Sequence, residues 1–376
     1  MEADRQRSGD THLLRLALPE LKNVDVYLKD EAVHPTGSLK HRLARSLFLH
    51  AICNGDIYES VHIVEASSGS TAIAEAFFAN LLGLEFTAVV PKATAPCKIE
   101  MIRKASANVH FAQPGYDLCA VAAELADRPG YYFMDQFTYA ERATDWRGNN
   151  NIAESIFDQM RFERHPVPAW IVVGAGTGGT ASTIGRYIRY RSELEATRLC
   201  VVDPQGSYFF KAFAEGEDCG PATNSDHIEG IGRKRPSPSF VPALVDQMIS
   251  VPDAASIAAA RWLETRIGKR FGPSTGTNLI GILSLANDAQ ELPRGCSIVT
   301  IGGDQGNRYA KTIYDDDWVL SMGLDLGPWT ERFEAFESGL PFNTDGLLIC
   351  RGNDPSPPSR TPCSKDNRSL KRVPTC

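Results

Sequence analysis

Apolar residues along this chain occur in two patterns, which alternate over most of its length. Short apolar runs rich in β-branched residues predict strands at 24–28, 61–65, 86–90, 109–111, 170–173, 199–202 and 297–301. Longer stretches of helical periodicity predict helices at 42–51, 70–82, 98–105, 117–127, 151–160, 180–191, 254–267 and 278–287. Strands that alternate with helices of this length are typical of parallel α/β units.

The strand predicted at 170–173, Trp-Ile-Val-Val, is apolar at every position. A strand with one face in water would alternate apolar and polar residues, whereas the strands of a parallel sheet are covered by helices on both faces. The sequence therefore predicts an α/β fold with parallel-rich sheets flanked by helices. It contains no internal repeat.

The composition limits the classes of function that need to be considered. The 376 residues allow two domains, and a net charge of −7 argues against a nucleic-acid partner. No run reaches the roughly 18 apolar residues of a membrane span. The polar N-terminus lacks the apolar segment of a signal peptide, and the nine cysteines contain no C-x-x-C pair. These features predict a cytoplasmic protein with reduced thiols, no metal site, no nucleic-acid partner and no membrane partner.

One lysine has an unusual setting. The segment P-T-G-S-L-K at 35–40 places Lys40 directly after a turn and before the helix predicted at 42–51. A lysine that forms a Schiff base with an aldehyde cofactor requires a rigid turn to aim its amine and surroundings that lower its pKa. A solvated lysine at a helix start would fit the same segment.

Hydroxyl residues are concentrated after the strand predicted at 61–65. The segment E-A-S-S-G-S-T at 65–71 carries four hydroxyl side chains in its last five residues, more than one helix cap requires. Hydroxyls and unpaired backbone N–H groups at a helix N-terminus suit a substrate carboxylate. The alternative is a polar loop with one N-cap residue, in which Glu65 is only a strand-end carboxylate.

A glycine-rich segment, G-A-G-T-G-G-T at 174–180, joins the strand at 170–173 to the helix at 180–191. Glycines let a backbone approach a phosphate closely, and the helix N-terminus supplies N–H donors. The segment also satisfies G-x-G-x-x-G, and Asp203 ends the strand at 199–202 near the position of a dinucleotide ribose acid. A nicotinamide enzyme is therefore an alternative, although Asp203 fits a strand-end turn with Pro204 better.

A fourth segment, G-P-S-T-G-T-N at 272–278, again opens a helix. The hydroxyl of Ser274 suits a hydrogen bond to the pyridine nitrogen of a pyridoxal cofactor, where a carboxylate would instead keep that nitrogen protonated. A capped helix start explains the segment equally when it is considered alone.

Together, the four segments resemble the cysteine synthase and cystathionine β-synthase family of pyridoxal phosphate enzymes, the fold type II group. They occur in the family's order, P-T-G-S-x-K, S-S-G-S-T, G-T-G-G-T and G-P-S-T-G, over roughly residues 20–320. The resemblance implies pyridoxal 5'-phosphate as the cofactor and a two-domain fold like that of the tryptophan synthase β-subunit. A dehydrogenase would explain the glycine-rich segment but neither the lysine turn nor the hydroxyl loop.

The resemblance implies a role for each matching position. Lys40 would be the Schiff-base lysine and would move the proton at Cα, residues 176–180 would cradle the phosphate, and Ser274 would face the pyridine nitrogen. The implied cofactor-binding residues are Lys40, Ser70, Gly176, Thr177, Gly178, Gly179, Thr180 and Ser274. The implied substrate-binding residues are Ser67, Ser68, Gly69, Thr71 and Gln136. The segment E-G-I-G at 229–232 resembles the family's loop at the mouth of the active site.

One position departs from the family pattern, because the family usually has asparagine where this chain has Ser70, and that amide binds the phenolic oxygen of the cofactor. The segment S-S-G-S-T and residues 137–151 look closest to bacterial L-cysteine desulfhydrases, and the Asn-Pro-x-Asn element of synthases is absent. The predicted function is elimination from L-cysteine to sulfide, pyruvate and ammonia. The alternatives are β-replacement of the cysteine synthase (O-acetylserine sulfhydrylase) or cystathionine β-synthase type, a serine or threonine dehydratase, a non-catalytic binding protein, and an NAD-dependent oxidoreductase.

The resemblance also implies the domain organisation. Residues 1–45 and 146–342 would form the larger, cofactor-binding domain, and residues 46–145 the smaller, mobile domain. Residues 343–376 are predicted to be a disordered tail, because 351–376 hold six basic and two acidic residues without apolar periodicity. Homodimers are usual in the family, so a homodimer is expected.

Overall fold

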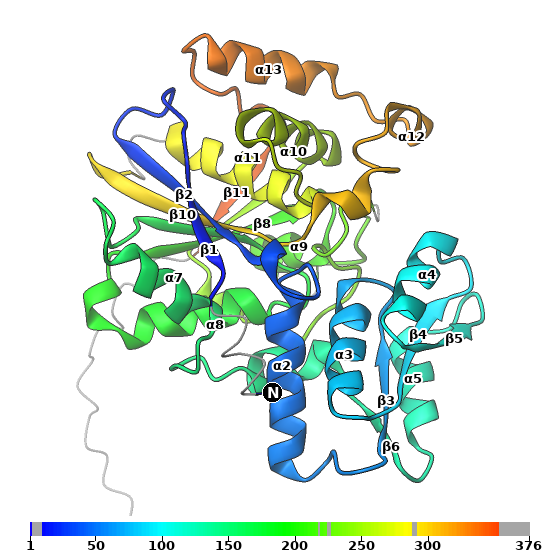
Figure 1. The fold of residues 1–376 in the computed structure, drawn as a ribbon. Coiled ribbons are helices and arrows are strands. Elements are labelled where there is room, and N and C mark those ends of the chain that lie inside the picture. The colour runs from blue at the N-terminus through cyan, green and yellow to red at the C-terminus, as the bar shows by residue number, and fades with distance from the viewer. Residues whose placement is uncertain (2–9, 217–218, 224–226, 288–291, 353–376) are drawn as a thin grey trace, which may run out of the picture.

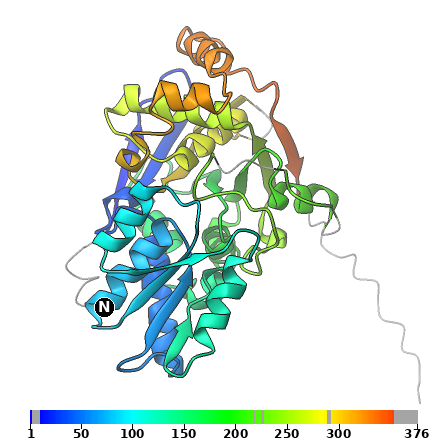
Figure 2. The ribbon, with the colours of Figure 1, turned by 90° about the vertical axis from the view of Figure 1, so that its right-hand side faces the viewer.

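Two β-sheets, one of seven strands and one of four, organise the chain, and helices cover both of them (Figure 1). The computed structural model describes residues 1, 10–216, 219–223, 227–287 and 292–352. Figure 2 shows the four-stranded sheet below the part of the molecule that holds the seven-stranded sheet. Each sheet with its helices forms its own hydrophobic core.

The seven-stranded sheet is parallel except at its two edges. Its strands, in spatial order, are β1 (His12–Leu16), β2 (Val24–Asp30), β10 (Cys296–Gly302), β7 (Trp170–Gly174), β8 (Arg198–Pro204), β9 (Gln247–Val251) and β11 (Leu348–Arg351). Strand β1 is antiparallel to β2, and β11 is antiparallel to β9, whereas the five inner strands are parallel. The strands of the four-stranded sheet, all parallel, are β5 (Asn108–Ala112), β4 (Phe86–Pro91), β3 (His62–Ala66) and β6 (Tyr131–Phe133).

Helices follow most of the strands. In chain order they are α2 (Lys40–Asn54), α3 (Ser70–Leu81), α4 (Pro96–Lys104), α5 (Leu118–Ala126), α6 (Gln136–Ala143), α7 (Ile152–Met160), α8 (Gly179–Tyr190), α9 (Tyr208–Glu215), α10 (Asp253–Ile267), α11 (Pro273–Asn287), α12 (Asp316–Ser321) and α13 (Gly327–Glu337). Short 3-10 turns are η1 (Glu31–Val33), η2 (Ser192–Leu194), η3 (Pro242–Leu244) and η4 (Gly306–Tyr309). Helix α11 begins at Pro273 rather than at the predicted residue 278, because proline is accommodated in the first helical turn.

Strand β7 is buried on both faces, as its sequence predicts. Trp170 and Val172 lie in the core that α10, α11 and α13 share, and Ile171 and Val173 lie in the core on the side of α7 and α8. All four side chains are at most 1% exposed. The predicted α/β fold with parallel-rich sheets is therefore confirmed.

Four strands were not predicted: β1, β6, β9 and β11. Strand β9, Gln-Met-Ile-Ser-Val, is fully buried, but polar Gln247 and Ser250 interrupt its apolar pattern. Strand β6 has three residues, and β1 and β11 are short edge strands with exposed positions. Neighbouring strands, rather than local apolar periodicity, define all four.

Two of the predicted boundaries lie at or next to regular elements of the structure, and the division into domains stays a prediction. The predicted boundary between residues 45 and 46 falls inside α2, where Ala44, Leu47 and Phe48 pack in the core of the four-stranded sheet. The tail predicted to begin at residue 343 instead contains β11, which pairs with β9 before the Gly352 N–H donates to Asp246 O at 2.7 Å. Residues 353–376 of the predicted tail lie outside the described residues.

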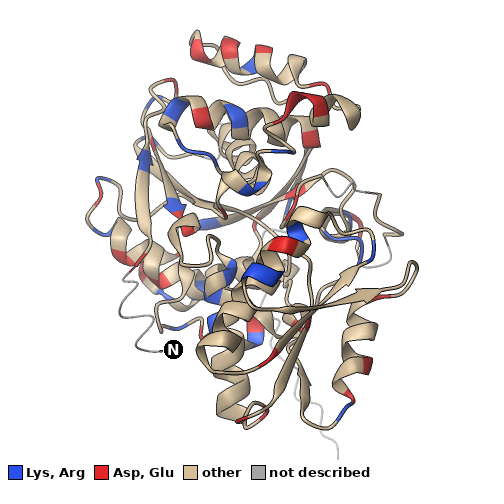
Figure 3. Cartoon of the chain, turned by 45° about the vertical axis from the view of Figure 1, so that its right-hand side comes forward, with Lys and Arg blue, Asp and Glu red and all other residues tan. Residues whose placement is uncertain are grey.

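Within the described ranges, no helix combines the length and the apolar character needed to cross a membrane. Lys and Arg positions are interspersed with Asp and Glu positions over both parts of the molecule (Figure 3).

Candidate functional site

A cleft of about 920 Å³ lies at the carboxyl ends of strands from both sheets. Its lining includes Ser67 after β3, Gly174 at the end of β7 and Gly303 after β10. Ligands of α/β proteins bind at this end of the strands, and the volume suits a cofactor with a small substrate. The predicted site residues that line the cleft are Lys40, Ser67, Ser68, Gly69, Ser70, Thr71, Gln136, Gly176, Thr177, Gly178, Thr180 and Ser274.

Lys40 is the first residue of α2 and is held by the turn that precedes it. Gly37 adopts φ +71°, a conformation that glycine tolerates, and the Leu39 N–H donates to Gly303 O at 2.7 Å. The Lys40 N–H donates to the Ser38 hydroxyl at 3.2 Å. These bonds fix the lysine backbone against the end of β10, which is the rigid mounting that a nucleophilic lysine requires.

The electrostatic surroundings of Lys40 favour its neutral form. Burial lowers the pKa of the Lys40 amine, and the carboxylate of Asp304 acts in the opposite direction. Burial also raises the pKa of Asp304, which accepts a hydrogen bond from the Tyr309 hydroxyl at 2.6 Å. A lysine with a lowered pKa has a larger fraction of the unprotonated amine that attacks an aldehyde.

The glycine-rich loop after β7 lies next to this amine. A Cβ added at Gly176 would overlap the carbonyl oxygen of Gly230 and would lie 3.8 Å from Lys40 Nζ. Gly178 adopts φ +90° at the start of α8, and an added Cβ would lie 2.5 Å from Phe240. At these two positions only glycine fits. The loop brings backbone N–H groups and the N-terminus of α8 to the cleft, an arrangement that fits a phosphate group.

Gly179 differs from its neighbours in the loop. It does not line the main cleft but a smaller adjoining pocket, and its N–H donates to the Thr177 hydroxyl at 3.2 Å. An added Cβ would lie 2.8 Å from the Ala140 Cβ in α6. The structure therefore explains this glycine by close helix packing rather than by an open surface toward the cleft.

The hydroxyl loop at 67–71 faces the same cleft from the four-stranded sheet. Gly69 is the N-cap of α3, and no side chain caps the helix. The Thr71 hydroxyl donates to Gln136 Oε1 at 2.8 Å, which joins the loop to α6. Backbone N–H groups, hydroxyls and the Gln136 amide are thus gathered at one helix N-terminus, an arrangement that suits a carboxylate.

Two buried acidic residues lie beside Gln136, and one of them binds its backbone. Glu65, at the end of β3, accepts from the Gln136 N–H at 3.0 Å, and Glu75 in α3 is its acidic neighbour. Both carboxyl groups are 0% exposed. Burial raises the pKa of Glu65 to about 7, and burial and the neighbouring Glu65 raise the pKa of Glu75 well above its ordinary range. Burial therefore favours the protonated form of both groups, so Glu65 is more than a strand-end carboxylate.

Ser70 has a partner that the sequence did not reveal. Arg308, in η4, donates to the Ser70 hydroxyl at 2.7 Å and also to the carbonyl oxygen of Thr36 in the lysine turn. One guanidinium therefore links the start of α3 to the turn that carries Lys40. Asparagine at position 70, as in the resembling family, would have to share this space with Arg308.

The first turn of α11 brings Ser274 to the cleft. The same helix contributes an asparagine that was not predicted as a site residue. A Cβ added at Gly303 would lie 3.3 Å from the Ser274 hydroxyl. Asn278 donates to Ile301 O at 3.0 Å, whereas its buried Oδ1 has no hydrogen-bond partner among the described residues. An unpartnered buried acceptor that borders a cavity is consistent with a polar ligand there.

Asp203 does not serve a dinucleotide site. It does not line the cleft, is 0% exposed and accepts from the Phe210 N–H at 2.9 Å at the start of α9. Burial raises its pKa to about 7. The strand-end interpretation of Asp203 is therefore correct, and the ribose-acid interpretation is wrong.

Two ion pairs cross the mouth of the cleft. Lys98 in α4 lies 2.8 Å from Glu229, and Arg235 pairs with Asp117, the N-cap of α5. The segment at 229–235 therefore borders the cleft opposite the four-stranded sheet. Its Gly232 N–H donates to Ala175 O at 2.8 Å, which couples the mouth to the glycine-rich loop.

These residues fit pyridoxal phosphate. Lys40, the bare backbone at Gly176 and the helix N-terminus of α8 could hold its aldehyde and phosphate, and Ser274 and Asn278 offer polar atoms near one side of the cleft. Lys40 and Asp304 lie far apart in the sequence and meet only in the fold. Asn278 lies in the segment at 272–278, but the sequence assigned no site role to it, to Asp304 or to Arg308, because their partners in the site come from other segments.

Comparisons with known proteins agree with this geometry. The family model of the pyridoxal-phosphate dependent enzymes matches residues 5–303. L-cysteine desulfhydrase Cds1 of Mycobacterium tuberculosis (strain ATCC 25177 / H37Ra) is 58% identical over 333 residues, covering 87% of this chain and 90% of the relative. N-(2-amino-2-carboxyethyl)-L-glutamate synthase of Ralstonia nicotianae (strain ATCC BAA-1114 / GMI1000) is 32% identical over 327 residues, covering 84% of this chain and 90% of the relative.

Among solved structures, a crystal structure of O-ureido-L-serine synthase superposes with a TM-score of 0.72 at 24% identity. The match covers 84% of this chain and 98% of that structure, and it establishes the shared fold.

Proposed function

This chain belongs to the family of pyridoxal-phosphate dependent enzymes, and from that premise we propose that it is an L-cysteine desulfhydrase, a carbon–sulfur lyase. The observation that carries the proposal is the 58% identity to an L-cysteine desulfhydrase over 87% of the chain. The geometry of the cleft also supports the proposal, because one cavity contains the buried Lys40, the glycine-rich loop and the hydroxyl loop at 67–71. The predicted dehydrogenase alternative is wrong, because the family match and the place of Asp203 both exclude it.

The reaction converts L-cysteine and water to sulfide, pyruvate and ammonia. Pyridoxal phosphate, when bound, supplies an electron-withdrawing system that makes the Cα–H bond of an amino acid acidic. In the proposed assignment Lys40 would hold the cofactor, residues 176–180 and the N-terminus of α8 would bind its phosphate, Ser70 would lie by its phenolic oxygen, and Ser274 would face its pyridine nitrogen. Asn278 is an additional candidate for the ring, because its Oδ1 lacks a partner among the described residues.

Lys40 is proposed to move the proton at Cα. Burial lowers its pKa, which increases the fraction of unprotonated amine that can accept a proton. Asp304, which opposes that shift, lies close enough to stabilise the ammonium form once the proton has arrived. The same lysine can therefore accept the proton and release it within one cycle.

The loop at 67–71 is proposed to bind the α-carboxylate of cysteine. The N–H groups at the start of α3 and the Ser67, Ser68 and Thr71 hydroxyls are suitable donors, and Gln136 is aligned by Thr71 and Glu65. A carboxylate fixed there holds the substrate by the end opposite its thiol.

The test uses purified holoenzyme with L-cysteine as the only substrate. Sulfide and pyruvate released in equal amounts, and abolished in Lys40→Ala, are the expected result. Cysteine formed from O-acetylserine and sulfide, without pyruvate from cysteine, would refute the lyase assignment and favour a synthase. The cofactor absorbance is recorded in the same samples, so that loss of the cofactor is distinguished from loss of turnover.

A homodimer and a cytoplasmic location are further predictions, which rest on the family resemblance and the sequence. Light scattering of the full chain at several protein concentrations tests the assembly, and a monomer mass at all of them would contradict it.

A further inference from the structure

The proposed function gives no role to Arg233, a cation that lines the cleft. Arg233 lines the cleft on the segment at 229–235, three positions after Gly230, whose carbonyl lies against the glycine that neighbours Lys40. We propose that Arg233 binds an acidic group on the sulfur substituent of the substrate, so that cysteine thioethers carrying a carboxylate are a substrate class of this enzyme. This inference rests on the proposed function, because it extends the same elimination to a larger leaving group.

The position of Arg233 is fixed by its backbone. Its N–H donates to the Ser207 hydroxyl at 2.9 Å, and its carbonyl accepts from the Tyr208 N–H at 2.8 Å. The guanidinium lies over the Phe137 ring, 3.8 Å from the ring centroid. Stacking of this kind occupies the flat face of a guanidinium and leaves the N–H groups at its edge available.

Arg233 has no anionic partner within the described part of the chain. No ion pair or side-chain hydrogen bond involves its guanidinium, and its buried Nε is without an acceptor. Burial lowers the pKa of Arg233, which is the effect expected when a cation loses water without gaining a compensating charge. Burial of a polar group without a partner is unfavourable, so a ligand that supplies an anion would be favoured.

The charged groups around Arg233 are already engaged. Asp117 accepts from Arg235 and from the Ala120 N–H, and Glu229 pairs with Lys98. The Cys119 thiol is close, but burial raises its pKa to about 11, so it carries no charge at neutral pH. Among the described residues, these neighbours therefore supply no spare anion to Arg233.

Arg233 and the proposed carboxylate loop belong to different segments of the cleft lining. The loop at 67–71 lies on the four-stranded sheet side, whereas Arg233 lies on the segment that follows β8 and α9. A substrate held by its α-carboxylate at the loop extends its sulfur substituent into the remaining cleft, which Arg233 borders. An acidic group at the end of that substituent would form the charge-assisted hydrogen bonds that a guanidinium favours.

The reaction balances with the same steps as for cysteine. The Cα proton passes to Lys40, the Cβ–S bond breaks and the sulfur keeps its electron pair, so that a thiolate with a carboxylate leaves. Water converts the remaining three-carbon unit to pyruvate and ammonia.

The experiment compares two ligands that differ only in charge, S-carboxymethyl-L-cysteine and S-carbamoylmethyl-L-cysteine. Binding of each to the holoenzyme is measured from the change in cofactor absorbance, and pyruvate release is followed in parallel. The acid is expected to bind at least about tenfold more tightly than the amide. Arg233→Met is expected to reduce this ratio to near one, whereas Arg235→Met, which removes a neighbouring cation already paired with Asp117, is expected to preserve it.

Equal affinities of the two ligands in the wild type would overturn the inference. So would an unchanged ratio in Arg233→Met, because both ligands carry the same α-carboxylate and a general loss of binding leaves the ratio intact. Elimination of L-cysteine is assayed on the same wild-type preparation. Its absence would contradict the proposed function, whereas the ratio tests Arg233 alone.

Discussion

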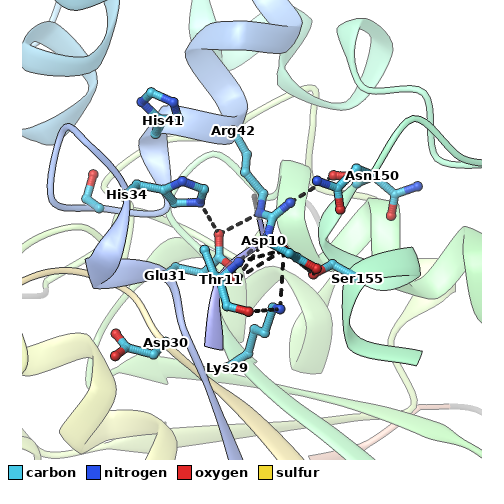
Figure 4. Close-up of polar contacts among 12 residues, drawn as sticks. Asp10, Thr11, Lys29, Asp30, Glu31, His34, His41, Arg42, Asn150 and Ser155 are labelled. Atoms are coloured by element: carbon cyan, nitrogen blue, oxygen red, sulfur yellow. Dashed lines mark hydrogen bonds and ion pairs between the residues drawn. The ribbon is translucent and has the colours of Figure 1, made fainter. Parts of the chain in front are cut away.

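The ion pair between Arg42 and Glu31 is expected to be essential for stability, and Arg42→Met tests this. Arg42 lies in the first turn of α2, two residues after Lys40, and Glu31 begins η1 (Figure 4). The guanidinium donates to both carboxylate oxygens, at 2.6 Å and 3.0 Å. The Glu31 side chain is 0% exposed and that of Arg42 is 8% exposed. Loss of one partner of such a pair leaves a buried charge uncompensated and costs about 3–5 kcal/mol.

The free energy of unfolding is expected to depend on pH differently in the wild type and in Arg42→Met. Burial by itself raises the pKa of Glu31, but the charge of Arg42 and the hydrogen bond from His34 hold it well below its ordinary value of 4.5. In the wild type this contribution to stability is present above the unfolded-state pKa and is lost as the pH falls through the folded-state pKa. In Arg42→Met the raising effect of burial dominates, so the folded state binds the proton more tightly than the unfolded state. The variant should therefore lose stability as the pH rises above about 4.5.

The assay is urea unfolding followed by circular dichroism at fixed protein concentration, at pH 7 and at pH 5. We expect the stability gap between wild type and Arg42→Met to be several kcal/mol at pH 7 and smaller at pH 5. The control is Arg15→Met, since Arg15 is 65% exposed and solvent therefore screens its ion pair with Asp25. A gap no larger than that of the control, or one that widens toward pH 5, would refute the reasoning.

Three further variants test the cleft. Gly176→Ala should weaken cofactor binding by at least about tenfold, because its Cβ would overlap a backbone carbonyl in the neighbouring loop, and absorbance titration with pyridoxal phosphate measures this. Ser70→Asn should displace Arg308 and shift the cofactor spectrum, and an unchanged spectrum and KM would show that their hydrogen bond is unimportant. The raised pKa values of Glu65 and Glu75 lower wild-type stability as the pH rises above about 4.5, and Glu75→Gln, which removes one of the two buried acids, should flatten that decline in thermal unfolding.

The local sequence determined the parts of the site that depend on turn chemistry. A turn with glycine at positive φ, hydroxyls at a helix start and a glycine-rich loop before a helix each depend on a few consecutive residues. They can therefore be recognised in the sequence, in the segments at 35–40, 67–71 and 174–180. The apolar strand at 170–173 predicted burial on both faces for the same reason. The family resemblance then implied that these separate segments meet in one cleft, where twelve of the thirteen predicted positions lie.

The tertiary structure alone decided which residues surround those segments. Arg308 reaches Ser70 across 238 positions, and Arg233 reaches Phe137 across the cleft, so no local pattern distinguishes either arginine from a solvated one. Gly179 matched a phosphate motif, yet its close neighbour is Ala140 in a different helix. The edge strand β11 exists because β9 offers it unpaired backbone groups. The backbone conformation of a turn or helix start depends on adjacent residues, so the sequence shows it. The burial, pKa and charge compensation of a side chain depend on neighbours that only the folded chain brings together.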